Sequence, residues 1–226
     1  MQVMAIDKEA YKKILLELGE NTTLVAVSKT KPVEDILELY HLGQRDFGEN
    51  YTQELVEKQA RLPADIRWHF IGHLQSNKVK QILPFIYLVQ GVDSLRLLQE
   101  INKQAAKINK TAAVLLQVHI AREETKFGLD EKELEDIFSE NQLATLQHVS
   151  IAGLMGLASF TDNADLLKKE FGHLKSLFDQ YARHPRSRSP FRFLSMGMSS
   201  DYTVALANGS NMVRIGSRLF GKRDRH

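Results

Sequence analysis

Short apolar runs rich in β-branched residues alternate with longer amphipathic stretches along the chain, and this alternation restricts the possible folds most strongly. Seven clear runs and one weaker run have the length and composition of buried strands. They cover residues 23–28, 45–47 (the weaker run), 68–71, 86–92, 113–120, 151–157, 191–195 and 212–216. Helical patterns fill the intervals, at residues 33–42, 51–61, 94–108, 130–139, 164–181 and 200–207. Repeated strand–helix alternation predicts a parallel sheet with helices outside it.

Eight strands is the number that closes a (β/α)₈ barrel, and 226 residues lie within the range of a compact barrel. An open doubly wound sheet is the rival architecture. The segment after the first strand, SKTKP at residues 28–32, lacks the glycine-rich fingerprint of the dinucleotide-binding form of that fold. No linker, repeat or low-complexity segment divides the chain. We therefore expect an α/β fold, a TIM barrel with an extra N-terminal helix, forming a single domain over residues 1–226.

Composition removes several classes of protein. Hydrophobic residues make up 43% of the chain and charged residues 26%, which is typical of a folded globular protein. The absence of cysteine excludes disulfides and thiolate metal sites. Residues 1–20 mix charged and apolar side chains and contain no signal-peptide core, and no later stretch is long enough to span a bilayer. We expect a cytoplasmic protein that does not enter the membrane.

The last fifth of the chain is electropositive. Residues 181–226 hold nine Lys or Arg against two Asp. Such a region attracts nucleic acid or a small phosphate. For Arg183, Arg186 and Arg188 we favour a solvated loop, because charge runs usually mark exposed segments. Few aromatic residues are interleaved at stacking distance, so no nucleic-acid partner is expected.

The residue directly after the first predicted strand is a candidate for chemistry. Functional groups of a barrel gather at the carboxyl ends of its strands, and Lys29 follows the apolar run at residues 24–27. A lysine partly stripped of water is a better nucleophile for an aldehyde. We therefore consider Lys29 a Schiff-base candidate, preferred over Lys31, which lies further into the loop and directly before Pro32. The alternative is a lysine that extends from the strand end into solvent.

Two turns containing glycine and serine follow the last two predicted strands. Gly197 precedes Ser199, and Gly216 precedes Ser217. Backbone amides and hydroxyl groups bind anions, and glycine permits close approach. Phosphate sites recur in the loops after strands seven and eight of a barrel. The two turns together predict a phosphate site, although each alone is also ordinary loop punctuation.

Three histidines lie on or near strands and raise the question of a metal. His69, His73 and His119 have neither ligand spacing nor an obvious carboxylate partner in the sequence. We interpret them as satisfied polar or core histidines and expect no metal site.

Five segments, in order along the chain, resemble the signatures of the pyridoxal phosphate homeostasis proteins, single-domain relatives of the alanine racemase barrel. They are AVSKTKP (residues 26–32), FGENY (47–51), WHFIGHLQSNK (68–78), SMGMSSD (195–201) and MVRIGSRLFG (212–221). The resemblance implies a barrel that binds pyridoxal 5'-phosphate (PLP). It departs from the usual pattern at His73, at His119 and in GLMGLA (153–158), which concerns the substrate-side surface and not the cofactor anchors.

Residue by residue, the resemblance implies a complete set of cofactor contacts. Lys29 matches the lysine that forms the aldimine, and Arg214 matches the arginine that faces the ring nitrogen. Ser199, Gly216 and Ser217 match the phosphate cradle. Asn50 and Met196 match residues that line the cofactor pocket.

The same resemblance favours a carrier over a catalyst. A protonated arginine beside the ring nitrogen opposes a second positive charge there and weakens the electron sink on which PLP chemistry depends. In alanine racemases an additional β-domain and a dimer partner supply the second acid–base group, a tyrosine. The chain ends at His226, soon after the last motif, so we expect no such domain.

We therefore expect no catalytic residue. The leading hypothesis is a monomeric protein that carries PLP as a lysine Schiff base, maintains its intracellular level and supplies PLP-dependent apoenzymes. A PLP-dependent racemase-like enzyme is the alternative. A lysine Schiff-base aldolase is a third possibility.

Overall fold

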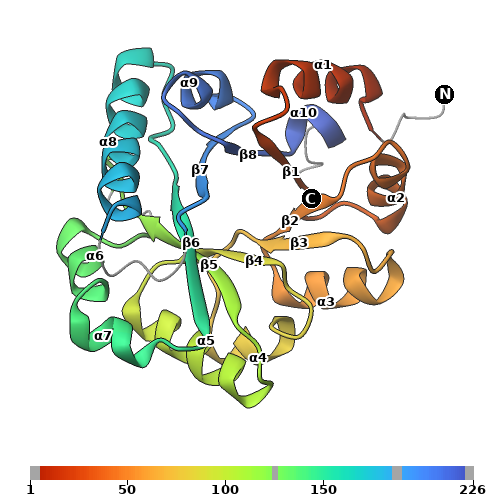
Figure 1. Cartoon of the computed structure of the whole chain (residues 1–226). Helices are drawn as coiled ribbons and strands as arrows, with labels where there is room; N and C mark the ends of the chain where they lie inside the picture. Colours follow the sequence, from red (N-terminus) through yellow and green to blue (C-terminus); the bar gives the residue numbers. More distant parts are fainter. Residues whose placement is uncertain (1–5, 124–126, 185–189, 222–226) are drawn as a thin grey trace.

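Eight parallel strands close into a barrel in the order in which they occur along the chain. This computed structural model describes residues 6–123, 127–184 and 190–221. Figure 1 shows the strands at the centre of a ring of helices. The strands are β1 (Thr23–Val27), β2 (Asp46–Glu49), β3 (Arg67–Phe70), β4 (Leu88–Val92), β5 (Ala112–Val118), β6 (Val149–Gly156), β7 (Phe193–Met198) and β8 (Met212–Ile215). The predicted barrel is confirmed, including the pairing of β1 with β8 that closes it.

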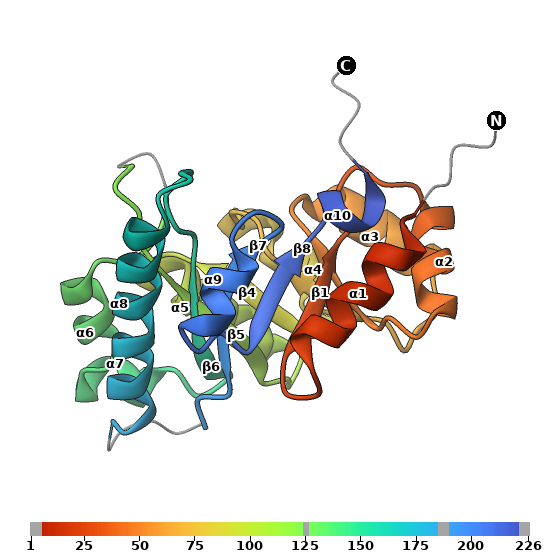
Figure 2. The ribbon, with the colours of Figure 1, turned by 90° about the horizontal axis from the view of Figure 1, so that it is seen from above.

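Helices lie on the outside of the barrel, one before β1 and the others after the strands. They are α1 (Lys8–Leu18), α2 (Val33–His41), α3 (Thr52–Arg61), the 3₁₀ turn η1 (Ser76–Lys78), α4 (Val79–Ile82), α5 (Leu95–Lys107), α6 (Glu131–Ile137), α7 (Glu140–Thr145), α8 (Ala164–Ala182), α9 (Tyr202–Ala207) and α10 (Ser217–Phe220). The expected extra helix is α1, which lies beside α10 (Figures 1 and 2). The amide of Asp7 ties the two together by donating to the carbonyl of Leu219 at 2.8 Å.

Capping residues set the start of three helices that the sequence predicts. The Ser94 side chain accepts from the amide of Leu97 and starts α5. Asp130 and Glu133 form a reciprocal capping box at α6, and Asn163 caps α8. Each side chain satisfies amide groups that a helix terminus leaves without partners.

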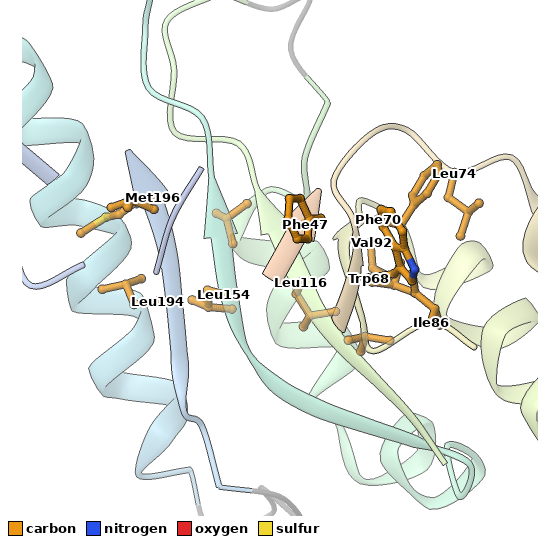
Figure 3. Packing of buried hydrophobic residues seen from close by; sticks show 14 of the residues in the cluster. Phe47, Trp68, Phe70, Leu74, Ile86, Val92, Leu116, Leu154, Leu194 and Met196 are labelled. Atoms are coloured by element: carbon orange, nitrogen blue, oxygen red, sulfur yellow. The ribbon is translucent and has the colours of Figure 1, made fainter. Parts of the chain in front are cut away.

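The apolar residues form two layers. The larger cluster lies between strands and helices, and Figure 3 shows part of it, including Phe47, Trp68 and Leu116. A smaller cluster fills the barrel interior, with Val25, Leu88, Leu115, Ala152, Met155 and Met212. Successive strand residues face opposite sides, so Leu24 and Ala26 join the outer layer while Val25 joins the inner one.

Charged residues at both ends of strand β2 explain why its sequence signal is weak. All four of its residues are buried, yet Asp46 and Glu49 at its two ends are charged. Their partners come from distant segments, Arg67 for Asp46 and Lys58 for Glu49. A local apolar pattern therefore cannot reveal the full strand.

Two further expectations concern the surface. Within the described ranges, no helix is long and apolar enough to cross a membrane. Arg183 is exposed just after α8, whereas Arg186 and Arg188 lie outside the described residues.

Candidate functional site

A cavity of about 530 Å³ opens among residues at and beyond the carboxyl ends of the strands. Six of the seven predicted site residues line it: Lys29, Asn50, Ser199, Arg214, Gly216 and Ser217. The other described lining residues are Val27, Lys31, Ile71, Leu157, Phe160, Met198, Ser200 and Gly221. The barrel thus brings together segments almost 190 positions apart in the chain.

Met196, the seventh residue, lies elsewhere. Its side chain is fully buried in the outer core cluster, on the same strand as Leu194 (Figure 3). Met198 lines the cavity instead. The reason is an irregularity in β7: the pairing with β8 shifts between Ser195 and Met198, and Gly197 has a φ of 98°. This break in the strand alternation separates the orientations of Met196 and Met198.

Two side chains of α3 hold the backbone around Lys29 through hydrogen bonds. Thr30 has a φ of 63°, and its amide donates to Glu54 Oε1 at 2.6 Å. Lys58 Nζ donates to the carbonyl of Ser28 at 2.7 Å. The Lys29 turn therefore has fixed hydrogen-bond partners on both sides. Further along the loop, Lys31 Nζ donates to the carbonyl of Phe220 at 2.7 Å, which links this loop to the end of α10.

Those contacts belong to a buried charged cluster. Lys58 Nζ lies 2.8 Å from Glu49 Oε1 and 2.6 Å from Glu54 Oε1, and the Ser28 hydroxyl donates to Glu49 Oε1 at 2.6 Å. Burial raises the pKa of Glu49 to about 6, although Lys58 and Ser28 act in the opposite direction. The second oxygen, Oε2, has no hydrogen-bond partner among the described residues. Sequence reasoning missed this cluster, because only the fold brings Ser28, Glu49 and Lys58 together.

Arg214 approaches the cavity from inside the barrel. Its Nη1 donates to Ser195 Oγ at 2.6 Å and its Nη2 to the carbonyl of Gly156 at 2.9 Å. Burial lowers the pKa of Arg214 to about 10, with Asp201 acting in the opposite direction, and the guanidinium remains charged at neutral pH.

The two predicted glycine–serine turns meet at the cavity. The amide of Gly216 points to Ser199 Oγ at 3.4 Å, and Ser217 begins α10. A Cβ on residue 216 would lie only 3.0 Å from the carbonyl oxygen of Val27, so glycine permits a close approach to β1. The lining residues include two lysines and an arginine, and none of those that the structure describes is acidic. This charge balance suits an anion.

Asn50 contributes a polar atom that lacks a partner. Its Oδ1 is buried and accepts no hydrogen bond from the described residues. An unsatisfied buried acceptor costs free energy, so its position beside the cavity suits a bound molecule with a donor group.

The three histidines have separate partners. His69 lies between Asp46 and Gln90, His73 pairs with Asp93, and His119 contacts the carbonyl of Glu123. Over the described part of the chain, no group of three or more histidines and carboxylates is arranged to hold a metal ion.

Comparison with known proteins places this barrel in a family. Residues 8–224 match the family described as "Alanine racemase, N-terminal domain". The "Pyridoxal phosphate homeostasis protein" of Pasteurella multocida is 40% identical over 206 residues, which cover 89% of this chain and 86% of that protein. The human protein of the same name is 39% identical over 211 residues, which cover 89% and 76%. The chain belongs to the pyridoxal phosphate homeostasis protein family.

Solved structures agree with the sequence resemblance. PipY of Synechococcus elongatus, solved with PLP bound, superposes with a TM-score of 0.85 at 34% identity and covers 94% of this chain and 99% of its own. Alanine racemase from Bartonella henselae has a TM-score of 0.74 at 18% identity, covering 97% of this chain and 62% of its own. The second likeness shows the fold alone. The resemblance stated from the five motifs is confirmed.

Proposed function

We propose that this protein binds PLP reversibly through a Schiff base on Lys29, maintains the free level of the cofactor and passes it to PLP-dependent apoenzymes. The Lys29 amine would condense with the aldehyde carbon, forming a carbon–nitrogen double bond and releasing one water, and hydrolysis would reverse the reaction. We propose further that it acts as a cytoplasmic monomer.

One observation carries this proposal: a single positively charged cavity is lined by Lys29, Arg214 and the Ser199–Gly216–Ser217 turns. An aldehyde that also bears a phosphate needs an amine and an anion site at the same time, and this cavity offers both. The unpartnered Asn50 Oδ1 adds a hydrogen-bond acceptor. PipY, at 34% identity, has been solved with PLP bound. The residues present therefore fit PLP.

A carrier suits this cavity better than a racemase. When bound, PLP supplies an aldehyde that captures amines and a ring that withdraws electrons. Arg214, charged and fixed, would oppose protonation of the ring nitrogen that it faces in this proposal. Racemisation also needs an acid or base on each face of the α-carbon, and the described lining residues include no tyrosine, histidine, cysteine or carboxylate. The amine of Lys31 is already hydrogen-bonded to Phe220.

The test is the absorption spectrum of the purified protein with added PLP, followed by borohydride reduction and peptide mass mapping. We expect visible absorption and a single reduced adduct on Lys29. Lys29→Ala should lose both signals, and the matched variant Lys31→Ala should retain them. An adduct on Lys31 would contradict the assignment of the lysine.

Failure of the purified protein to take up PLP would overturn the proposal. If borohydride instead trapped a simple ketone or aldehyde substrate on Lys29 without any chromophore, the aldolase alternative would replace it. Transfer is tested by mixing the loaded protein with a PLP-dependent apoenzyme and following the recovery of its activity against the same concentration of free PLP.

A further inference from the structure

The interior of the barrel contains a line of polar residues where such barrels usually place branched apolar ones. Asp46, His69, Gln90, Ser195 and Arg214 come from β2, β3, β4, β7 and β8, and all five are buried. His69, Gln90 and Ser195 have no exposed surface. Buried polar groups are costly unless they are hydrogen-bonded, so their partners matter.

Each of these residues is bonded to the next. Arg214 Nη1 lies 2.6 Å from Ser195 Oγ, and Ser195 Oγ lies 2.6 Å from Gln90 Oε1. Gln90 Nε2 lies 2.9 Å from His69 Nδ1. His69 Nε2 lies 3.0 Å from Asp46 Oδ1, which Arg67 also contacts at 2.8 Å. This row of hydrogen bonds therefore runs from the cavity, across the barrel, to the salt bridge between Asp46 on β2 and Arg67 on β3.

The chemistry of its two ends fixes the direction of every bond. Arginine can only donate, so the Ser195 oxygen accepts from Arg214 and its hydroxyl proton is given to Gln90 Oε1. The amide nitrogen of Gln90 then donates to His69 Nδ1. Ionised aspartate can only accept, so His69 Nε2 carries the proton and donates to Asp46. His69 is thereby held neutral in one tautomer.

The surroundings of His69 agree with a neutral ring. Burial lowers its pKa, and the charge of Arg67 acts in the same direction, while Asp46 opposes both. The Tyr87 ring packs against it with centroids 5.4 Å apart. A second proton on Nδ1 would set two donors, His69 and Gln90, against each other. This row of hydrogen-bonded side chains therefore allows only one arrangement of its protons.

We propose that His69, Gln90 and Ser195 are positioning residues, a one-directional hydrogen-bond relay that holds the Arg214 guanidinium in place against the cavity. The relay ends at the Asp46–Arg67 pair, which anchors it. This inference rests on the proposed function for the ligand that Arg214 meets, PLP, but the relay itself is a property of the protein without ligand.

A purely structural role is the competing explanation, since any satisfied polar network rigidifies a core. Two features favour positioning. Arg214 stands at the cavity end of the line and is oriented by the relay through only one of its nitrogens, Nη1. Among the described residues, His69, Gln90 and Ser195 make no side-chain hydrogen bond to a lining residue other than Arg214, so a defect in the relay should reach the cavity through Arg214.

The first experiment needs no cofactor. Nitrogen-15 NMR of the free protein should show His69 neutral, with the proton on Nε2, over about pH 5 to 8, the range in which an ordinary histidine titrates. In Gln90→Glu the new carboxylate accepts from Ser195 but has no donor for His69, so His69 should become doubly protonated at neutral pH. A His69 that titrates normally in the wild type, or keeps its tautomer in Gln90→Glu, would overturn the relay.

The second experiment uses added PLP. Ser195→Ala and Gln90→Leu should each weaken retention about tenfold, a change of about 1.4 kcal/mol, and shift the pH midpoint of the visible absorption. Gln117→Leu is the matched control, because Gln117 is a buried glutamine on neighbouring β5 that donates to Phe127 outside the relay. Folding of all variants is checked by thermal unfolding, and Gln90→Glu serves as the isosteric variant if Gln90→Leu does not fold.

The outcomes separate the two proposals. If the wild type takes up no PLP, the proposed function fails while the NMR result stands or falls alone. If the wild type takes up PLP, and the relay variants match Gln117→Leu in affinity and pH midpoint, the line of polar residues is only structural and the positioning role is refuted.

Discussion

At the scale of single residues, the serines of the two turns give the most direct test of the anion site. Ser199 is half-buried and contacts the Gly216 amide, whereas Ser217 is exposed at the start of α10. Replacing both with alanine should weaken PLP retention, because each hydrogen bond to a charged group contributes about 1.5–3 kcal/mol. The melting temperature should barely change. Equilibrium dialysis measures the affinity, and unchanged affinity would move the phosphate site elsewhere.

The control for this pair is Ser139→Ala. Ser139 stands at the N-terminus of α7 without a side-chain capping bond and lies outside the cavity. The Ser139→Ala variant loses a hydroxyl group outside the proposed site, so its affinity for PLP should equal that of the wild type.

Glu49 makes a second prediction, on pH. Its pKa is raised from 4.5 to about 6, chiefly by burial, so between these values the folded state binds more protons than the unfolded state. The contribution of Glu49 to stability is therefore largest below pH 4.5 and is lost as the pH rises to 6. A shift of this size corresponds to about 2 kcal/mol. The effect concerns Glu49 alone and adds to those of other carboxylates.

The measurement compares Glu49→Gln with the wild type by urea unfolding at pH 4 and pH 7. The variant cannot take up the proton, so its free energy of unfolding relative to the wild type should rise by about 2 kcal/mol between the two pH values. A difference independent of pH would show that Glu49 ionises normally in the folded protein.

Individual residues also mark the limit of what a sequence predicts. Strand-end position predicts that Lys29, Ser199, Gly216 and Ser217 lie near one another, and the family resemblance adds Asn50 and Arg214; all six line one cavity. Met196 does not line the cavity: it joins the outer cluster with Leu194, and Ser195 between them faces the barrel interior, so ordinary strand alternation turns Met196 away from the cavity. Phe160, from the β6–α8 loop, also lines the cavity, and its sequence offers only an isolated aromatic residue in a loop.

At the scale of elements, strand β7 depends on the unusual backbone of Gly197. A Cβ there would lie 2.7 Å from the Ala205 Cβ and 2.9 Å from the Tyr202 Cα, in addition to the strain of a φ of 98°. Gly197→Ala should lower stability by about 1–3 kcal/mol, and should weaken PLP retention by displacing Met198 and Ser199. Thermal unfolding and dialysis measure the two effects.

Gly43→Ala is the matched control. Gly43 has a φ of 106° but open space where the Cβ would stand. The Gly43→Ala variant therefore has the backbone strain of a positive φ but no steric clash of the new Cβ, and residue 43 is far in sequence from the β7 turn. It should lose less stability than Gly197→Ala and keep full affinity, and equal losses in both variants would mean that contact with α9 does not matter.

The elements themselves were predicted well where periodicity is strong. All eight strands lie at or beside their predicted positions, and α5, α6 and α8 begin within one residue of the starts of their predicted ranges. The short helices α4 and α7 were missed, because four to six residues carry too little periodicity. Strand β2 starts at Asp46 and ends at Glu49, two residues beyond the predicted run at residues 45–47. The buried charges at its two ends, Asp46 and Glu49, are satisfied by Arg67 and Lys58.

At the scale of the whole molecule, barrel closure is what makes a cavity from distant segments. Pairing of β8 with β1 brings Arg214 beside Val25 in register, and the loops that follow these strands then carry Gly216 and Lys29 to the same mouth. The relay uses the same closure, because it joins strands on different sides of the barrel. Neither arrangement is visible as a local pattern.

The whole-molecule prediction is that this protein fails as a racemase even when saturated with PLP. Arg214 remains charged at neutral pH and, facing the ring nitrogen as proposed, would weaken the electron sink. The described lining residues supply no second acid or base beyond the hydrogen-bonded Lys31. A positioned acid or base contributes about 10²–10⁴ to a rate, so turnover should fall far below the roughly 10 s⁻¹ of a typical enzyme. The measurement is chiral analysis after incubation with L-alanine and other L-amino acids, beside an alanine racemase at equal concentration. Turnover within tenfold of that control, abolished by Lys29→Ala, would refute the carrier and establish the enzyme.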